Sequence, residues 1–382
     1  MLRTIVKCIS RVISYIIPQS KILLFFSYPN FTDNSYALYL HILSRPEYIK
    51  YKKIWILDYN EPDCDSKMQQ IKKIDNKTIV AKMNSISSLW YYYRAEFFFF
   101  THSLYSSFLL KDKSRRINLW HGMPLKNIGV LQHNSPATKT CSHLIIATSE
   151  LFQGIMARAF QHPLDKVIIS GQPRNDLFWD DTDFWEKYKI APENYIKIGM
   201  WLPTYRTSLA DDGSIVNEGS VVSYLSFLTY SEIEKLNLFL AERNILIIVK
   251  LHPMDILNEK QLPIFSNIRI YSKYDFTSQL YPLLGKMDFL LTDYSSVWVD
   301  FEILNKPIGF VMNDIDDYST SRGFTIDNLI EKLPGTVINN FDKLEDFLIN
   351  LPNGCHKNSI WNQYKDGQSS ARVMNYLNSL TD

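Results

Sequence analysis

At about 150 residues per domain, the 382 residues of this chain suggest two or three domains. Its 41 basic and 40 acidic residues leave a formal net charge of +1, which excludes a strongly basic nucleic-acid-binding protein and an acidic disordered tail. With 46% hydrophobic and 14% aromatic residues, the chain can bury a large core, so intrinsic disorder is excluded as well. The four cysteines form no C-x-x-C pair or zinc-site spacing and are interpreted as isolated reduced thiols.

The first 17 residues predict an amphipathic helix. Arg3, Lys7 and Arg11 share one face with Ser10 and Ser14, while aliphatic side chains fill the opposite side. The stretch is too short to span a bilayer, which needs about 20 apolar residues. A basic amphipathic helix suits an anionic membrane surface. The alternative is a helix that packs on the protein's own core.

Short apolar segments alternating with helical patterns follow, and this alternation is typical of parallel βαβ units. Helices are predicted at residues 34–44 and 86–93, and a polar loop at residues 61–65. Strands are predicted at residues 21–28, 53–58, 78–81, 96–101, 116–120, 144–148 and 167–170.

A polar stretch at residues 180–194 is the predicted domain boundary, and a second alternating series follows it. Its strands are predicted at residues 196–200, 245–251, 268–271, 289–292 and 307–311, and its helices at residues 231–242 and 368–380. The sequence therefore predicts two open parallel α/β domains, residues 18–190 and 195–365, with a last helix in residues 366–382. Ligands of such sheets bind at the carboxyl ends of the strands, so the predicted site is a cleft between the two domains.

Several well-known catalytic motifs are missing from the sequence. It has no G-x-G-x-x-G, no P-loop, no H-E-x-x-H and no G-x-S-x-G. This disfavours a nicotinamide dehydrogenase, a P-loop NTPase and a serine hydrolase. Candidate chemistry lies instead in four loops that leave predicted strands.

The first loop is LWHGMPLKNIG, in which His121 follows an apolar strand. Gly122 permits a tight turn, and Lys126 is available to meet an anion. A histidine in this position is placed for proton transfer near pH 7. The alternative is a hydrogen-bonded structural histidine.

The second loop is KLHP, in which Lys250 and His252 lie on the same side of the chain at the end of a strand. Such a pair can neutralise or hydrogen-bond a phosphate. The alternative is a strand-end lysine and a capped histidine.

The third loop is LTDYSSVWVD, in which Asp293 ends a strand and Ser295 and Ser296 lead into a helix. Serines and free backbone N–H groups at a helix N-terminus favour an anion site, and the alternative is a serine cap without a ligand. Asp300 and Glu302 follow in the helix, either within reach of a sugar hydroxyl or facing solvent.

The fourth loop is WLPTYR, in which Arg206 either pairs with a phosphate or lies on the surface. Together the four loops hold histidines, cations and helix-start serines, with no evident metal cage. This chemistry matches the recognition of a phosphate or diphosphate with acid–base help.

An ordered set of motifs resembles the CDP-glycerol glycerophosphotransferases, the teichoic-acid primases and polymerases of bacterial envelopes. The motifs are WHGMPLKNIG, GQPRND, PTYR, KLHP, TDYSSVWVDFEILNKPIGFV, RGF and WNQYKDGQSSARV. The resemblance runs from about Lys21 to the C-terminus, and the TDYSS…LNKP block is its most specific part. Met123 departs from the threonine that polymerases often have at that place.

The resemblance implies a GT-B-like fold, with a Rossmann-like acceptor domain facing a Rossmann-like CDP-polyol donor domain across a cleft. It implies an EC 2.7.8-class transfer of glycerol phosphate, or a related polyol phosphate, to an acceptor hydroxyl on a lipid-linked or growing teichoic-acid-like polymer, with release of CMP. The donor substrate is expected to be CDP-glycerol or CDP-ribitol, and the sequence shows no evident metal-site residues and no certain cofactor. The expected product is a wall teichoic acid or a teichoic-acid-like capsule. The expected place of action is the cytoplasmic face of the cell membrane, with residues 1–17 expected to bind the surface peripherally.

The resemblance also implies roles for individual residues. His121 corresponds to a general base for the acceptor hydroxyl, and His252 is expected at the donor diphosphate. Residues expected around the donor phosphates and cytidine are Lys250, Arg206, Asp293, Ser295 and Ser296, and those expected on the acceptor side are Gly122 and Lys126. Three alternatives stay open at this point: a ribitol-phosphate transferase, a sugar-nucleotide glycosyltransferase of envelope polysaccharide synthesis, and a non-catalytic membrane-surface scaffold.

Overall fold

A computed structural model of the chain describes residues 2–106, 108–110, 115–132, 142–183, 185–203, 207–209, 215–217, 225, 228–251, 264–271, 275–276, 280–312, 323–351 and 359–380. The chain forms two compact units. Unit 1 comprises Met1–Met123, Gly129–Leu177 and Asp366–Asp382, and unit 2 comprises Pro124–Ile128 and Phe178–Lys365. The chain therefore leaves unit 1 just before the polar stretch predicted as a boundary, and its last helix returns to unit 1.

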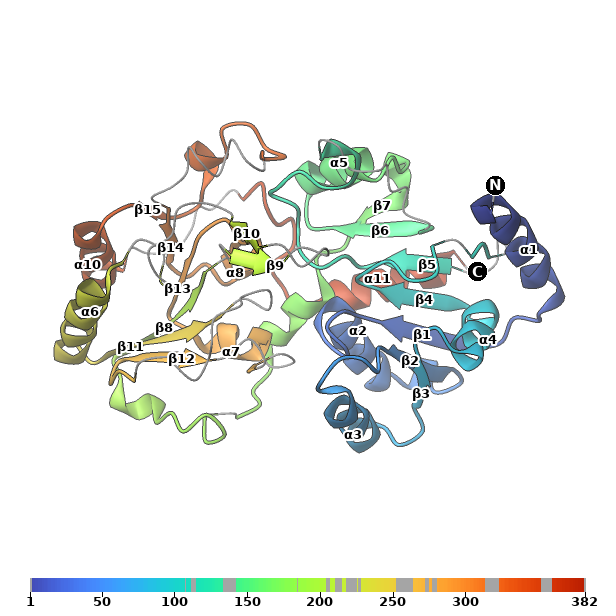
Figure 1. Ribbon diagram of the computed structural model, residues 1–382, viewed down its shortest axis with the longest axis horizontal. Coiled ribbons are helices and arrows are strands. Elements are labelled where there is room, and N and C mark those ends of the chain that lie inside the picture. The colour runs from blue at the N-terminus through green and yellow to red at the C-terminus, as the bar shows by residue number, and fades with distance from the viewer. Residues whose placement is uncertain are drawn as a thin grey trace. The chain divides into compact units, whose positions relative to one another are not determined.

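Unit 1 contains a seven-stranded sheet in the order β3-β2-β1-β4-β5-β6-β7, with every neighbouring pair parallel (Figure 1). Its strands are β1 (Ile22–Phe26), β2 (Lys52–Leu57), β3 (Ile79–Lys82), β4 (Phe97–Phe100), β5 (Arg115–Asn118), β6 (Leu144–Ala147) and β7 (Val167–Ile169). Its α-helices are α1 (Leu2–Ile16), α2 (Asp33–Leu43), α3 (Cys64–Ile74), α4 (Ile86–Arg94), α5 (Glu150–Ala159) and α11 (Ser369–Ser379).

Unit 2 contains a six-stranded parallel sheet in the order β12-β11-β8-β13-β14-β15 and a two-stranded antiparallel sheet. The parallel strands are β8 (Lys197–Leu202), β11 (Ile245–Lys250), β12 (Ile268–Tyr271), β13 (Phe289–Thr292), β14 (Ile308–Val311) and β15 (Thr336–Ile338). The antiparallel pair is β9 (Thr207–Leu209) and β10 (Ile215–Asn217). The α-helices are α6 (Tyr230–Glu242), α7 (Leu280–Lys286), α8 (Val297–Phe301) and α10 (Phe341–Asn350).

These two sheets confirm the predicted α/β fold, because each predicted strand is present within a few residues of its expected bounds. The residues predicted as a polar loop, 61–65, instead lead into α3. Its sequence CDSKMQQIKKI carries too few apolar residues to show a helical period. Cys64 and Ile71 nevertheless face the core.

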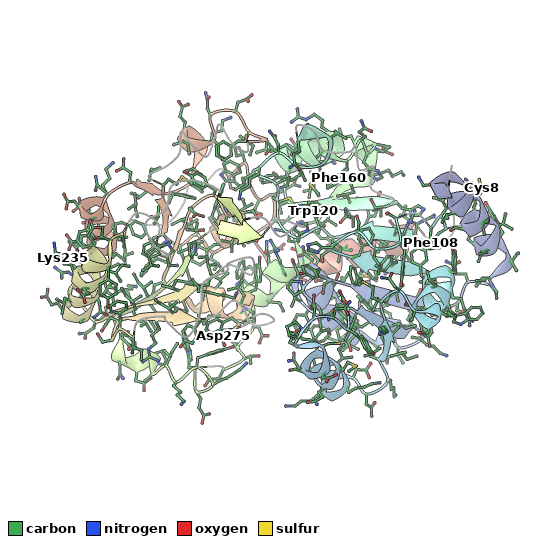
Figure 2. The ribbon with its side chains drawn as sticks, in the orientation of Figure 1. Cys8, Phe108, Trp120, Phe160, Lys235 and Asp275 are labelled. Carbon is green, nitrogen blue, oxygen red and sulfur yellow. The ribbon has the colours of Figure 1, made fainter. Side chains whose placement is uncertain are left out.

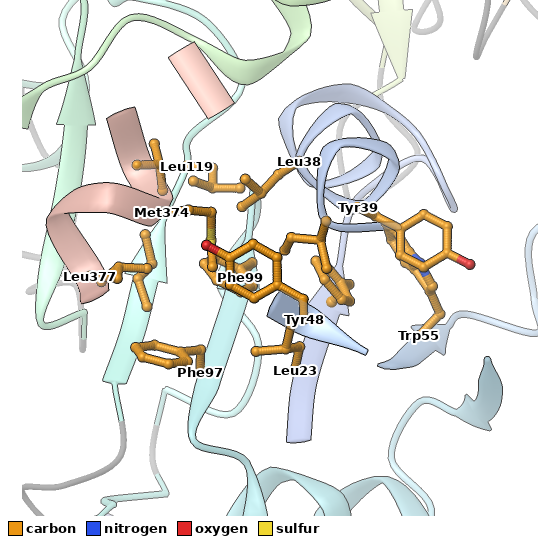
Figure 3. Close-up of a cluster of buried hydrophobic side chains, with 14 of the residues drawn as sticks. Leu23, Leu38, Tyr39, Tyr48, Trp55, Phe97, Phe99, Leu119, Met374 and Leu377 are labelled. Carbon is orange, nitrogen blue, oxygen red and sulfur yellow. The ribbon is translucent and has the colours of Figure 1, made fainter. Parts of the chain in front are cut away.

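The unit 1 core shows why the C-terminal helix belongs to this unit. The central strands are buried on both faces, as expected for a parallel sheet covered by helices. Met374 and Leu377 of α11 join the cluster that contains Phe99 and Leu119, so residues from both ends of the chain share one core (Figure 3). Burying two such side chains contributes roughly 3–6 kcal/mol to the free energy of unfolding.

Helix α1 packs on unit 1 through a face that the sequence analysis assigned incorrectly. Ser10 and Ser14 were expected on the basic outer face, but both side chains are buried. The Tyr93 hydroxyl donates to Ser10 Oγ at 2.9 Å, and Ser10 Oγ donates to the Leu109 carbonyl at 3.1 Å. Ile13 packs against the adjoining core cluster. The Ser14 hydroxyl donates to the Arg11 carbonyl at 2.7 Å, so both buried serine hydroxyls have hydrogen-bond partners.

The opposite side of α1 exposes part of its apolar arc. Ile9, Val12 and Ile16 are 55%, 59% and 73% exposed, and Lys7 and Arg11 flank them on the surface. One side of the apolar arc therefore covers the core, as the alternative interpretation expected, and the other side faces outward. Binding of this helix to a membrane surface stays a prediction. Among the described residues, no helix combines the length and apolarity needed to cross a bilayer.

Candidate functional site

The sheet topology of unit 1 concentrates several loops at one edge. The strand order reverses between β1 and β4, and such switch points open a crevice at the carboxyl ends of the strands. Residue Asp33 follows β1, His102 follows β4 and His121 follows β5. The fold thus brings side chains from three neighbouring strand ends together.

His121 lies at this edge in a defined tautomer. Its Nδ1 is 3.2 Å from the Thr101 carbonyl oxygen, which can only accept, so Nδ1 carries the proton and Nε2 holds a lone pair. Part of the residue is exposed to solvent. Protein atoms nevertheless surround much of the imidazole ring, and this desolvation lowers the pKa of His121. A neutral, accessible imidazole is suited to accept a proton near pH 7.

Two aromatic rings flank His121. The His102 ring stacks on it with a centroid separation of 4.1 Å and planes 10° apart, and the Trp120 ring lies 4.1 Å away at 31°. His102 and Trp120 make no ring contact with each other, so they cover opposite faces of His121. Trp120 also contacts Phe160 at 4.8 Å, and Figure 2 labels both. His102 is absent from the sequence-based predictions, although its position two residues after the FFFF strand was an available signal.

Asn34, which the sequence analysis also missed, joins two of the sequence motifs. Its Nδ2 donates to the Leu119 and Trp120 carbonyl oxygens at 2.9 and 3.0 Å. Its Oδ1 accepts from the Arg174 backbone nitrogen at 3.0 Å. Trp120 has a φ of 51°, a left-handed conformation that is costly for a bulky residue and that these hydrogen bonds stabilise.

A partly buried ion pair sets the local charge. Arg174 Nη1 lies 2.9 Å from Asp33 Oδ1, with the side chains only 7% and 14% exposed. Asp33 raises the pKa of His121 and Arg174 lowers it, both less than desolvation does. Burial, rather than this ion pair, is therefore the main cause of the lowered pKa of His121.

The predicted acceptor-side residues divide between the two units. Gly122 belongs to unit 1 and has a φ of 133°, in the region that favours glycine. Lys126 belongs to unit 2, where it forms an antiparallel bridge with Phe324. The Thr325 backbone nitrogen donates to the Leu125 carbonyl at 2.9 Å. The loop after His121 is thus pinned to the segment that contains the RGF motif.

In unit 2, Lys250 and Asp293 lie at the corresponding switch point. Strands β11 and β13 both pair with β8, where Val249 aligns with Trp201 and Thr292 with Leu202. The next residues, Lys250 at the end of β11 and Asp293 after β13, therefore flank the end of β8. Both side chains are buried. Desolvation lowers the pKa of Lys250 to about 8, while Asp275 acts in the opposite direction.

Ser295 and Ser296 precede α8, as predicted, and are partly exposed. Helix α8 is only a single turn, so its dipole is weaker than the predicted helix start implied. The Ser296 side chain makes no capping hydrogen bond. Polar contact with an anion would therefore come mainly from the hydroxyls and the local backbone.

Asp300 and Glu302 were expected to reach a sugar hydroxyl or face solvent, and both expectations are wrong. Asp300 is buried and accepts from the Tyr281 hydroxyl at 2.8 Å. Glu302 is 1% exposed, pairs with Lys365 at 2.5 Å and accepts from Asn362 Nδ2 at 3.0 Å. Glu302 thus holds the WNQYKDG motif at the end of α8, while Asp300 connects α8 to Tyr281 of α7.

His252 and Arg206, the two remaining predicted site residues, lie outside the described residues. Within the described ranges, no group of three or more His, Cys, Asp or Glu side chains is arranged to hold a metal ion. The described residues thus provide a histidine edge in unit 1 and, separately, a lysine–aspartate–serine edge in unit 2.

Comparison with known proteins identifies relatives of the whole chain. A family model described as CDP-Glycerol:Poly(glycerophosphate) glycerophosphotransferase matches residues 9–379. The teichoic acid glycerol-phosphate primase of Bacillus subtilis is 30% identical over 72% of this chain and 71% of its own length. The teichoic acid poly(glycerol phosphate) polymerase of Bacillus spizizenii is 26% identical over 99% of this chain and 97% of its own length.

Among solved structures, a variant of the wall teichoic acid polymerase TagF superposes with a TM-score of 0.70 at 21% identity. The match covers 99% of this chain and 92% of the TagF chain. This likeness confirms the predicted GT-B-like fold built from two Rossmann-like domains.

Proposed function

This chain belongs to the CDP-glycerol:poly(glycerophosphate) glycerophosphotransferase family, and we propose that it transfers glycerol phosphate from CDP-glycerol to a hydroxyl group of a teichoic-acid-like acceptor. The observation that carries this proposal is the family match across residues 9–379. The acceptor oxygen forms a bond to the β-phosphorus, the bond from that phosphorus to the bridging oxygen breaks, and CMP leaves. A single displacement of this kind needs no enzyme nucleophile.

On the acceptor side, we assign His121 as the general base. Its lone pair on Nε2 takes the proton of the acceptor hydroxyl as the new P–O bond forms. Support comes from the Nδ1 contact with Thr101 and from the lowered pKa, which keeps the ring neutral at pH 7. Gly122, next to the base, has a backbone conformation that favours glycine, and Lys126 is proposed to contact acceptor phosphates.

On the donor side, we assign Lys250, Ser295 and Ser296 to the diphosphate. Negative charge develops on the phosphoryl oxygens and on departing CMP, and a cation with hydroxyl donors stabilises it. Asp293 lines the same strand edge. By the resemblance, His252 and Arg206 complete this set.

The direct test is to incubate the full chain with CDP-glycerol and a lipid-linked acceptor that ends in a glycerol phosphate, and to follow CMP release and product mass. Each turnover should add one glycerol phosphate to the acceptor and release one CMP. UDP-N-acetylglucosamine serves as the control donor. Transfer from the UDP-sugar but not from CDP-glycerol would refute the proposal in favour of a glycosyltransferase.

The donor polyol needs its own comparison. The residues assigned to the donor side are proposed to contact phosphate, and this role does not distinguish glycerol from ribitol. Parallel reactions with CDP-glycerol and CDP-ribitol, compared by kcat/KM, separate the two. A higher kcat/KM for CDP-ribitol would make the chain a ribitol-phosphate transferase.

For its place of action, we propose the surface of an anionic membrane at the cytoplasmic face. The exposed Ile9, Val12 and Ile16 of α1 would enter the interface, with Lys7 and Arg11 against the head groups. Each basic residue near such a surface contributes about 1 kcal/mol, or about fivefold in binding.

Vesicle flotation with phosphatidylglycerol-containing liposomes tests this placement. The double variant Val12→Glu/Ile16→Glu should lose most binding, and Lys7→Glu/Arg11→Glu should lose binding to anionic but not neutral vesicles. Ile264→Glu is the matched control, because Ile264 is 98% exposed and belongs to unit 2. Equal flotation of all variants would refute the role of α1.

A further inference from the structure

His102 contacts His121 although neither the sequence motifs nor the proposed reaction includes it. The two histidines follow β4 and β5, which are adjacent parallel strands. Their rings stack 4.1 Å apart with planes only 10° from parallel. Trp120 covers the other face of His121 at 4.1 Å. The His121 ring therefore cannot rotate about χ2 without losing contact on both faces.

Thr101 connects both histidines through separate atoms. Its carbonyl oxygen accepts from His121 Nδ1 at 3.2 Å, and its hydroxyl lies 3.0 Å from His102 Nδ1. One residue therefore orients both rings. In this arrangement the plane of His102 also determines the plane of His121.

The charges around the pair favour two neutral rings. Desolvation, followed by repulsion from His121, lowers the pKa of His102 to about 3. Asp33 raises the pKa of both histidines, and Arg174 lowers that of His121. The Tyr28 ring also meets the His102 ring edge-on, with centroids 5.6 Å apart. Near pH 7 His102 thus provides a ring face without placing a second positive charge beside His121.

We propose that His102 is a positioning residue, whose ring holds His121 in the plane where Nδ1 bonds to Thr101 and Nε2 is left to take the acceptor's proton. This inference rests on the proposed role of His121 as general base. It adds a residue outside the family motifs to the machinery for proton transfer. The expected consequence is an effect on kcat rather than on donor binding.

Three substitutions at His102 distinguish the contribution of its stacked ring from that of its hydrogen bond to Thr101. His102→Phe keeps a ring, His102→Asn keeps a polar atom for Thr101 but no ring, and His102→Ala keeps neither. We expect kcat to fall about tenfold in the Asn and Ala variants with KM for CDP-glycerol within twofold of wild type. The Phe variant should retain most activity. His162→Ala, in a turn elsewhere in unit 1, is the control.

A readout independent of activity is the tautomer of His121, observed by ¹⁵N–¹H NMR. Wild type and His102→Phe should show a single Nδ1–H form, and His102→Asn and His102→Ala a mixture. The inference would be overturned if the Asn and Ala variants kept the wild-type kcat and the single Nδ1–H tautomer. It would also be overturned if kcat fell equally in the Phe and Asn variants. Failure of the base assignment is distinguishable, because it would appear as full activity in His121→Ala whatever the tautomer.

Discussion

The Asp176 carboxylate accepts a hydrogen bond at 2.8 Å from the backbone nitrogen of Ser369, which lies 193 residues later in the chain. It accepts a second at 2.7 Å from the next backbone nitrogen, that of Ser370. Both N–H groups belong to the first turn of α11, where helices have unpaired donors. The GQPRND and DGQSSARV motifs therefore meet to attach the C-terminal helix to unit 1.

Removing this carboxylate should destabilise unit 1. Asp176→Ala leaves two partly buried N–H groups without their acceptor, and we expect a loss of about 1–3 kcal/mol in the free energy of unfolding, measured by urea denaturation. Asp176→Asn retains one acceptor oxygen and should lose less. Equal stability of the Ala variant and wild type would show that water replaces the carboxylate without cost.

His121→Ala should reduce kcat for CMP release by about 100- to 10,000-fold, because the acceptor hydroxyl then has no positioned base. The wild-type rate should fall as pH drops below the pKa of His121, which burial lowers from its usual 6.5. Above that pKa the ring is neutral and the rate should be level. Stopped assays between pH 5 and 8 measure both effects.

His252→Ala tests the donor side of the same reaction. We expect a raised KM for CDP-glycerol together with a lower kcat, because the donor diphosphate loses a contact. His162→Ala should match wild type in both constants. If His121→Ala and His252→Ala both release CMP at the wild-type rate, the assignment of the site fails.

The strand pattern in the sequence predicted the fold well because the central parallel strands, such as β1, β11 and β13, are buried on both faces and read as nearly continuous apolar runs. The same apolar signal predicted where His121, Lys250 and Asp293 would lie, since each directly follows such a run. It could not predict α3, whose exposed face is polar through most of its length.

Contacts between distant segments were beyond the sequence pattern. Asn34 reaches Trp120 across 86 residues, and Glu302 reaches Lys365 across 63. Nothing in the local sequence distinguishes these polar residues from exposed ones. The inward turn of Ser10 likewise depends on Tyr93, which is 83 residues away.

Lys250 should make donor binding dependent on pH. Its ammonium, with a pKa of about 8, is mostly protonated at pH 7 and loses its charge as pH rises through 8. Attraction to the diphosphate is therefore present at low pH and lost at high pH, so kcat/KM for CDP-glycerol should fall above pH 8. Lys250→Arg keeps its charge and should remove this decline.

Lys250→Met removes the charge altogether and should raise KM for CDP-glycerol at least tenfold at pH 7. Its stability should not decrease, because the buried ammonium is itself costly to desolvate. Lys235→Met on the exposed side of α6, labelled in Figure 2, is the control. A wild-type KM for Lys250→Met would remove Lys250 from the donor site.

The buried ion pair between Glu302 and Lys365 gives a prediction about unit 2. Glu302→Ala leaves Asn362 Nδ2 with only the Val299 carbonyl oxygen as acceptor and removes the carboxylate partner of Lys365, although Lys365 is 31% exposed and can be partly hydrated. We therefore expect a loss of about 2 kcal/mol in urea denaturation, below the 3–5 kcal/mol typical of a fully buried broken pair. Glu302→Gln should lose less, since its amide oxygen still accepts from Asn362.

Glu242→Gln is the matched control, because its pair with Arg243 lies on the surface and contributes at most about 1 kcal/mol. An equal effect of Glu302→Ala and Glu242→Gln would mean that the WNQYKDG motif is held by packing rather than by this pair.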